Sequence, residues 1–313
     1  MGNLKQDSKL IYQSQKISVD ICVITFRRPE GLGRLLNGLN SLAFNESKIL
    51  NIRVIVVDND STGSASKVCE SIIPSFRFPL IYSIETSRGI SYARNQAIAC
   101  VSDKADFVAF IDDDEVPEKY WLDELLTTQE KYDADVVSGP VLPIFPSPSV
   151  APWVTRGKFF ERPRYPTGFC RKTAATNNVI VRREIFREMD KLFDERFALT
   201  GGEDGHFFRR VYQSNYKIIW ADKALVYEFI PESRTNIRWL IKRTYRTYST
   251  FSMHEQEFDG SIKSQCLTII KASGRVIIGV VQIIPSLVFG KHIFVKALLN
   301  IFGGVGRLSL IHI

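Results

Sequence analysis

The chain has 313 residues, enough for about two average domains or for one large domain with an appendage. Hydrophobic residues make up 45% of the sequence, which is normal for a globular core and excludes a disordered chain. The formal net charge is +7, but no signature of a nucleic-acid-binding module accompanies it, so we expect no binding to DNA or RNA.

The cysteines and the N-terminal segment indicate a cytoplasmic protein. The five cysteines form no CxxC pair and their number is odd, so we expect buried free thiols rather than disulfides. The N-terminal residues are polar and lack the apolar stretch of a secretory signal. We therefore predict a disordered leader over residues 1–17.

Strand and helix patterns alternate through the first half of the chain. Short apolar runs predict strands over residues 19–26, 52–57, 80–84, 107–111 and 136–137. Helical periodicity predicts helices over residues 32–42, 65–72 and 91–101, the last capped by Ser91, and a further helix with Pro117 in its first turn. Strands joined by helices imply an α/β fold with a mostly parallel sheet.

The second half of the chain is less regular. Residues 139–172 are rich in proline, which predicts a lid or binding loop. Beyond it, the patterns predict a strand over residues 178–181, a helix over 203–212 and a strand over 217–220.

Near the C-terminus, residues 276–289 form an almost continuous apolar run, interrupted by Gln282 and Pro285. This run is shorter than the roughly 20 residues that a helix needs to span a bilayer. A buried core helix and a helix lying on an anionic membrane surface both fit the pattern. Flanking cations favour the membrane surface: Lys271, Arg275, Lys291, Lys296 and Arg307.

The strand predicted over residues 107–111 leads directly into four carboxylates, from Asp112 to Glu115. Side chains alternate along a strand, so we expect Asp112 and Asp114 on one face and Asp113 on the other. Two carboxylates at the C-terminal end of a strand suit Mg²⁺ or Mn²⁺ with a bound phosphate ester. Taken alone, the motif also fits a solvated acidic turn.

Other polar residues fit the same interpretation but are weak signals alone. Asp58 follows the second strand and could accept hydrogen bonds from a ribose or a base, or could make an ordinary turn. Arg94 lies in the first turn of a helix, where anions are favoured. Arg243 and Arg246 are spaced by one helical turn and could clamp a diphosphate or form a basic face near a membrane.

Several ordered motifs resemble family 2 glycosyltransferases of the GT-A fold. They include Thr25-Phe-Arg-Arg-Pro, Val57-Asp-Asn-Asp-Ser, Arg88-Gly, Ala93-Arg-Asn, Ile111-Asp-Asp-Asp, Asn177-Asn-Val-Ile-Val-Arg-Arg, Phe193-Asp-Glu-Arg-Phe and Gly201-Gly-Glu-Asp. The resemblance implies a Rossmann-like sheet flanked by helices over residues 18–225, which bind the nucleotide sugar and hold the catalytic site. Residues 226–313 would then form a basic and apolar helical appendage that associates with the membrane.

The resemblance also implies roles for individual residues. Thr25, Arg27, Asp58, Arg94, Asp112 and Asp113 would bind the donor, while Asp112 and Asp114 would hold a divalent metal, Mg²⁺ or Mn²⁺. Asp204 would be the catalytic base, with Glu203 beside the acceptor; otherwise both are acids favoured by a helix dipole. The chain has His206 where a second acid is usual in the family.

The implied activity is that of an inverting, metal-dependent, hexosyltransferase-like enzyme. It would move one sugar from a nucleoside-diphosphate sugar to a hydroxyl of a glycan or lipid-linked acceptor in bacterial surface-polysaccharide biosynthesis, working peripherally at the cytoplasmic face of the membrane. A processive synthase is disfavoured because the Q-x-x-R-W signature and multiple spanning helices are absent from the sequence.

Two other functions also use such a sheet. A nucleotidyltransferase would carry paired aspartates too, but residues 25–33 lack the glycine density of its usual phosphate loop. A catalytically silent nucleotide-binding scaffold would not need the intact carboxylate sets at Asp112, Asp114, Glu203 and Asp204.

Overall fold

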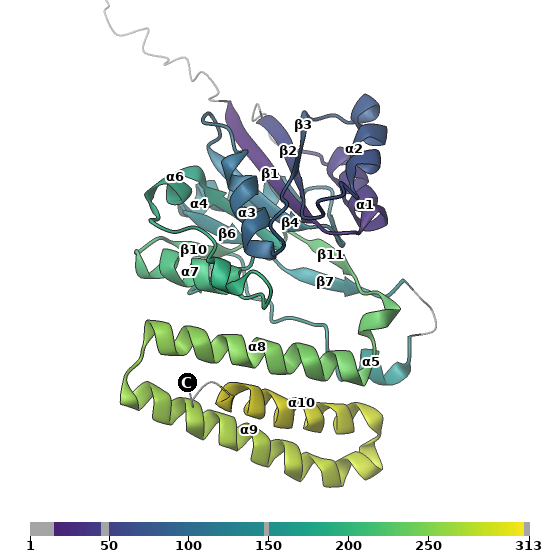
Figure 1. Ribbon diagram of the computed structural model, residues 1–313, viewed down its shortest axis with the longest axis vertical. Helices are drawn as coiled ribbons and strands as arrows, with labels where there is room; N and C mark the ends of the chain where they lie inside the picture. Colours follow the sequence, from purple (N-terminus) through teal and green to yellow (C-terminus); the bar gives the residue numbers. More distant parts are fainter. Residues whose placement is uncertain (1–15, 45–49, 147–149, 310–313) are drawn as a thin grey trace, which may run out of the picture.

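In the computed structural model, which describes residues 16–44, 50–146 and 150–309, a mixed sheet with helices on both faces lies above a layer of three long helices (Figure 1). The predicted leader lies almost entirely outside the described residues. Over the described part, the fold is the expected α/β arrangement followed by a C-terminal helical appendage.

The main sheet has eight strands in the order β3-β2-β1-β4-β9-β6-β10-β8. Their bounds are β1 Ile17–Thr25, β2 Leu50–Asp58, β3 Leu80–Ile84, β4 Phe107–Asp112, β6 Val136–Ser138, β8 Cys170–Arg171, β9 Asn178–Arg182 and β10 Ile218–Trp220. β1, β2, β3 and β4 pair in parallel, as do β6 and β10. β9 runs antiparallel to both β4 and β6, and β8 runs antiparallel to β10.

Helices cover both faces of this sheet. They are α1 Pro29–Asn40, α2 Ser66–Ile72, α3 Ile90–Ala99, α4 Trp121–Tyr132, α6 Arg183–Glu188 and α7 Glu203–Gln213. Alternate residues of β1 divide between the two sides: Ile21 and Val23 pack into the core with α1, α2 and α4, while Cys22 packs into the core with α3, α6 and α7. Both cores are formed by the alternation that predicts the strands.

A second sheet has three strands in the order β5-β11-β7, with bounds β5 Glu115–Pro117, β11 Val226–Phe229 and β7 Val141–Ile144. Pro117 therefore ends a strand, and the helix predicted to hold it in its first turn begins only at Trp121. β11 continues the sheet contacts past residue 225, the predicted end of the catalytic domain.

Other differences from the predicted elements are local. The proline-rich segment 139–172 contains β7, the short helix α5 Pro152–Gly157 and β8 rather than loop alone. Gly89, not Ser91, caps α3, and the Ser91 hydroxyl donates to the carbonyl of Asp194. All five cysteines are free, but Cys170 and Cys266 are exposed, so the expected burial is wrong for these two.

The C-terminal layer consists of α8 Ile237–Phe258, α9 Ile262–Phe289 and α10 Lys291–Leu308. α8 lies nearest the sheet, α9 lies farthest from it, and α10 packs between them (Figure 1). Glycines allow this close packing: a Cβ on Gly304 would lie 2.6 Å from the carbonyl oxygen of Ala272, and one on Gly306 would lie 2.5 Å from that of Tyr245.

α9 is longer and more exposed than the sequence pattern predicts. It has 28 residues, and in the part of the chain that the structure describes it is the one helix long and apolar enough to cross a membrane. Its apolar residues face outward, with Leu287 85% and Val288 82% exposed. The core-helix interpretation is therefore wrong within this chain, and the estimate that the segment is too short to span is corrected.

Candidate active site

The C-terminal ends of β1, β2 and β4 meet at one edge of the main sheet. Thr25 is in register with Asp58, and Ile24 with Asp112. A pocket of about 470 Å³ opens at this edge, and we call it the strand-end pocket. It is lined by Ile24, Thr25, Phe26, Arg28, Asn59, Arg88, Gly89, Ile90, Asp112, Asp113, Asp114, Ala198, Leu199, Glu228, Arg234 and Arg246.

All three aspartates at the end of β4, Asp112, Asp113 and Asp114, line the strand-end pocket. The expectation that Asp113 points away is wrong, because β4 ends at Asp112 and the chain turns, so strand alternation stops there. Asp113 accepts from the Thr25 hydroxyl at 2.8 Å and from Arg28 at 2.9 Å. The carboxylates are therefore balanced by donors from the loop after β1.

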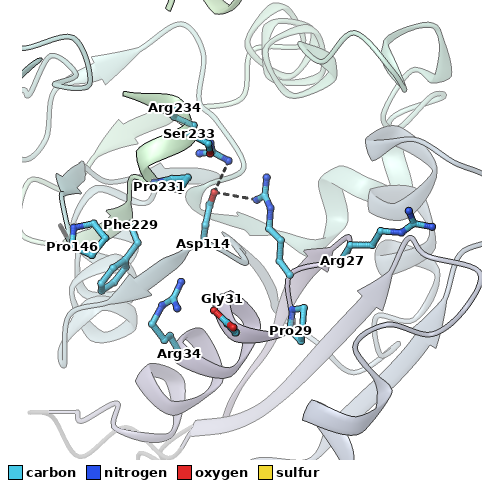
Figure 2. A pocket seen from close by; sticks show the side chains of 12 residues that line it. Arg27, Pro29, Gly31, Arg34, Asp114, Pro146, Phe229, Pro231, Ser233 and Arg234 are labelled. Atoms are coloured by element: carbon cyan, nitrogen blue, oxygen red, sulfur yellow. Dashed lines mark hydrogen bonds and ion pairs between the residues drawn. The ribbon is translucent and has the colours of Figure 1, made fainter. Parts of the chain in front are cut away.

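Asp114 lies between two guanidinium groups (Figure 2). Its Oδ2 accepts from Arg28 at 3.1 Å and from Arg234 at 2.9 Å. The same three residues also line a second, adjoining cavity of about 630 Å³, to which Arg34 and Phe229 contribute. Asp114 and its two arginines thus form a shared wall between the two cavities.

Glu115, the fourth carboxylate, supports the turn instead of facing the pocket. It is 1% exposed and accepts from the Asp112 backbone N–H at 3.0 Å and from the Asn177 side chain at 3.2 Å. Burial, together with the charge of Asp112, raises the pKa of Glu115 well above its usual value. Through these hydrogen bonds Glu115 stabilises the turn that follows β4.

Asp112 and Asp114 offer only oxygen donors, which is the ligand chemistry that Mg²⁺ and Mn²⁺ prefer. Reduced hydration at the floor of the pocket raises the pKa of Asp112; Arg94 opposes this shift, whereas Asp114 and Asp113 add to it. Among the described residues, no group of three or more His, Cys, Asp or Glu side chains could hold a metal alone. A metal that fits here would therefore share its coordination with phosphate oxygens and water.

Arg94 and Glu203 form a buried ion pair behind the pocket. Their side chains are 4% and 2% exposed, and neither lines the strand-end pocket. Arg94 also approaches Asp112, at 3.7 Å. Arg94 therefore contacts both Asp112 and Glu203. Glu203 pairs with Arg94 and does not line the strand-end pocket.

Asp204 follows Glu203 in the first turn of α7 and remains partly exposed. Its Oδ1 accepts from the Gly205 backbone N–H at 2.6 Å, and no hydrogen bond to Oδ2 is formed within the described ranges. Burial lowers the pKa of His254 in α8 to about 4, and the negative charge of Asp204 acts against this shift. His206 is buried and contacts Glu257 at 3.1 Å, a structural role.

Asp58 is fully buried and does not line the pocket. It accepts from the backbone N–H groups of Asp60 and Ala65 and from the Tyr82 hydroxyl. Its neighbour Asn59 does line the pocket: its side chain donates to the carbonyls of Glu85 and Ser87 and accepts from the N–H of Gly89. Asn59 therefore shapes the loop that carries Arg88.

The sequence suggests donor binding for Arg27 and no role for its neighbour Arg28, but in the structure the two side chains have different partners. The side chain of Arg27 is 65% exposed, pairs with Asp60 at 2.9 Å and points away from Asp114 (Figure 2). Arg28 faces the carboxylates instead. The sequence pattern does not distinguish the two arginines.

Of the two arginines predicted to clamp a diphosphate, only Arg246 lines the strand-end pocket. Arg243 packs over the ring of Trp239, with its guanidinium carbon 5.2 Å from the ring centroid. Burial, followed by the charge of Arg162, lowers the pKa of Arg243. Arg234, which no sequence motif marks, reaches the pocket in its place.

Comparison with known proteins agrees with this geometry. Residues 20–190 match the model of "Glycosyl transferase family 2". The chain is 35% identical over 240 residues to "Succinoglycan biosynthesis protein ExoM" of Rhizobium meliloti (strain 1021), a match that covers 76% of this chain and 75% of the relative. It is 25% identical over 258 residues to "Glucosyl-dolichyl phosphate glucuronosyltransferase" of Haloferax volcanii, covering 74% of each.

Solved structures share the fold. The mannosyltransferase PcManGT from Pyrobaculum calidifontis, solved with GDP-Man and Mn²⁺, aligns with a TM-score of 0.59 at 15% identity and covers 99% of this chain and 79% of its own. S. aureus TarS 1–349 aligns with a TM-score of 0.54 at 18% identity, covering 95% and 92%. With a GT-A fold and a family match over more than half its length, the chain belongs to glycosyltransferase family 2.

Proposed function

We propose that this glycosyltransferase transfers a single sugar, with inversion, from a nucleoside-diphosphate sugar to a hydroxyl of a glycan or lipid-linked acceptor in bacterial surface-polysaccharide biosynthesis. The observation that carries the proposal is the strand-end pocket, in which Asp112, Asp113 and Asp114 face arginines from three separate segments. Alternating carboxylates and guanidinium groups suit a diphosphate bound together with a divalent cation.

Under this proposal, the residues that line the pocket have separate tasks. Arg28, Arg234 and Arg246 would bind diphosphate oxygens, and Asn59 would hold the loop around the nucleoside. A divalent cation bound at Asp112 and Asp114 would neutralise the charge of the leaving diphosphate. Asp204 would accept the proton of the acceptor hydroxyl while that oxygen bonds to the anomeric carbon and the diphosphate departs from the opposite side.

A panel of nucleotide sugars, assayed with and without Mn²⁺, tests this proposal. We expect release of a nucleoside diphosphate from one donor, and we expect Mn²⁺ to be required. Release of pyrophosphate would instead indicate a nucleotidyltransferase, and no turnover with any donor would indicate a silent nucleotide-binding protein.

We further propose that α9 attaches the protein to the cytoplasmic face of an anionic membrane. Its outward stripe is apolar, and Lys271 and Lys291 are exposed beside it. Two of the predicted flanking cations do not contribute: Arg275 packs over the Tyr248 ring, and Arg307 pairs with Glu255. Each exposed lysine near an anionic surface adds about 1 kcal/mol, less at high salt.

Serine substitutions at Ile284, Leu287 and Val288 are expected to abolish binding to vesicles that contain anionic lipid. These side chains are 73–85% exposed, so their loss should leave folding unchanged. Co-sedimentation at low and high salt measures the effect. A matched control with Ile73→Ser and Ile84→Ser, also exposed apolar residues, should bind as the wild type does. Unchanged vesicle binding by the α9 variant would contradict the proposal.

A further inference from the structure

A separate cavity of about 520 Å³ lies between α7, α8 and the start of α9, and we call it the helix pocket. Its wall combines apolar and cationic side chains. The aromatic rings of Phe251 and Phe258 come from α8, and Leu267 comes from α9. Lys263 and Lys271 stand on the same stretch of α9. A ligand that satisfies this wall has an apolar part and an anionic group.

The free charge in the helix pocket is cationic. Two acids also line it, but both are engaged: Glu255 accepts from Arg307 and Thr268, and Asp259 accepts from the N–H of Ser261. Neither Lys263 nor Lys271 forms an ion pair or hydrogen bond with any residue in the described ranges. The two lysines are therefore available to an anion from outside the chain.

The helix pocket lies close to the catalytic base proposed above. α8 carries Arg246 in the strand-end pocket and His254 in the helix pocket, two turns or about 12 Å further along. Between them, Thr250 packs against Gly202, at the start of α7. Asp204 follows in the first turn of α7, and the next residue, Gly205, is part of the helix-pocket wall.

The opening of this pocket is continuous with the apolar stripe of α9. Leu267 is 44% exposed and lines the pocket, and Ile270 in the next turn is 65% exposed. An amphiphile whose chain lies along α9 can thus place its charged head at Lys263 and Lys271. Gly205, in the first turn of α7, lines the same cavity, so a group attached to the head can reach that turn.

We propose that the helix pocket binds the phosphate-bearing head of a lipid-linked acceptor. Its role in the reaction rests on the proposed glycosyltransferase function, whereas binding itself does not. The ligand is a phosphate ester of a long apolar alcohol. The two lysines would form ion pairs with the phosphate, and Leu267 and the two phenylalanine rings would pack against the first part of the hydrocarbon chain.

Farnesyl phosphate, used below its micelle concentration, tests the site by titration calorimetry on the full chain. Inorganic phosphate and farnesol serve as the two partial ligands. We expect farnesyl phosphate to bind far more tightly than either. Equal binding of inorganic phosphate would make this a free-phosphate site, and equal binding of farnesol would show that the lysines play no part; each result would overturn the proposal.

Two variants examine the site by different means. Lys263→Gln with Lys271→Gln should weaken farnesyl phosphate binding about 25-fold, since each lysine contributes about a factor of five. Ser264→Trp, which fills the pocket without changing charge, should abolish it. The control Arg238→Gln with Lys242→Gln removes the same charge from α8 outside the pocket and should bind normally.

Nucleoside diphosphate binding, measured on every variant, keeps the two proposals apart. It should be unchanged in the helix-pocket variants, because none of the substituted residues lines the strand-end pocket. A wild-type protein that binds farnesyl phosphate but no nucleotide would refute the proposed function and leave the site standing. Pocket variants that bind farnesyl phosphate as the wild type does, or a control that loses it equally, would refute the site.

Discussion

Replacing Asp204 with asparagine is expected to lower turnover by about 10²–10⁴-fold and to leave donor binding unchanged, because the shape is kept while the basicity is lost. Asp204 lies outside the strand-end pocket, so the donor should not sense the change. Its Oδ1 is held by the Gly205 N–H, which orients the carboxylate. Steady-state kinetics and calorimetry with the nucleotide sugar measure the two effects separately.

The neighbouring Glu203 provides the contrast. Glu203→Gln should cost about 3 kcal/mol of unfolding free energy, since the buried Arg94 then loses its nearest carboxylate and keeps only the longer contact with Asp112. Denaturant unfolding reports this loss. If Glu203→Gln folds as stably as the wild type but is inactive, while Asp204→Asn remains active, the assignment of the base is wrong.

Asp114→Ala is expected to remove Mn²⁺-dependent nucleotide binding and to reduce turnover by about 10²–10⁴-fold. A bound metal contributes several kcal/mol to stabilising transition-state charge, and each 1.36 kcal/mol is a factor of ten in rate. Calorimetry of nucleoside diphosphate with and without Mn²⁺ gives a readout that is independent of turnover. Full wild-type activity in excess chelator would contradict the role of the metal.

The Asp114→Ala variant should still fold. Arg28 keeps its pair with Asp113, and Arg234 keeps its pair with Glu228 at 3.2 Å. Relief of repulsion between carboxylates should not stabilise it, because the arginines already balance their charges. Asp222→Ala is a matched control, since it removes a carboxylate that pairs with Arg164 and lines neither of the two cavities.

The sequence predicts the part of the fold that periodicity controls. β1, β2 and β4 are apolar runs that end in polar residues, so the meeting of Thr25, Asp58 and Asp112 at one edge follows from parallel pairing. The turn after Asp112 cannot be predicted in this way, because it depends on a hydrogen bond between Glu115 and Asn177, which are 62 positions apart in the sequence. The hydrophobic pattern of the sequence predicts that a strand forms, but it does not predict the residue at which the strand ends.

Two features of the site and its surroundings could not be predicted for a related reason. Arg234 reaches Asp114 across 120 positions of the chain, and no local motif marks it. In the sequence, the apolar run within α9 begins at residue 276 because Arg275 interrupts the pattern, yet the Arg275 side chain turns inward and donates to Asn300 at 3.1 Å. A helix continues through a polar residue whose partner lies on a neighbouring helix.

Asp114 couples two segments that are far apart in the sequence, because it forms ion pairs with both Arg28 and Arg234. Arg28 immediately precedes α1, and Arg234 belongs to the 3₁₀ turn Glu232–Arg234, which leads into α8. Whatever moves that turn alters the surroundings of Asp114, and whatever binds Asp114 alters the position of the turn, by the same free energy in both directions. Under the proposed function, membrane attachment through the C-terminal helices and donor binding in the strand-end pocket are therefore linked equilibria, and donor affinity measured on the free protein need not equal that on a lipid surface.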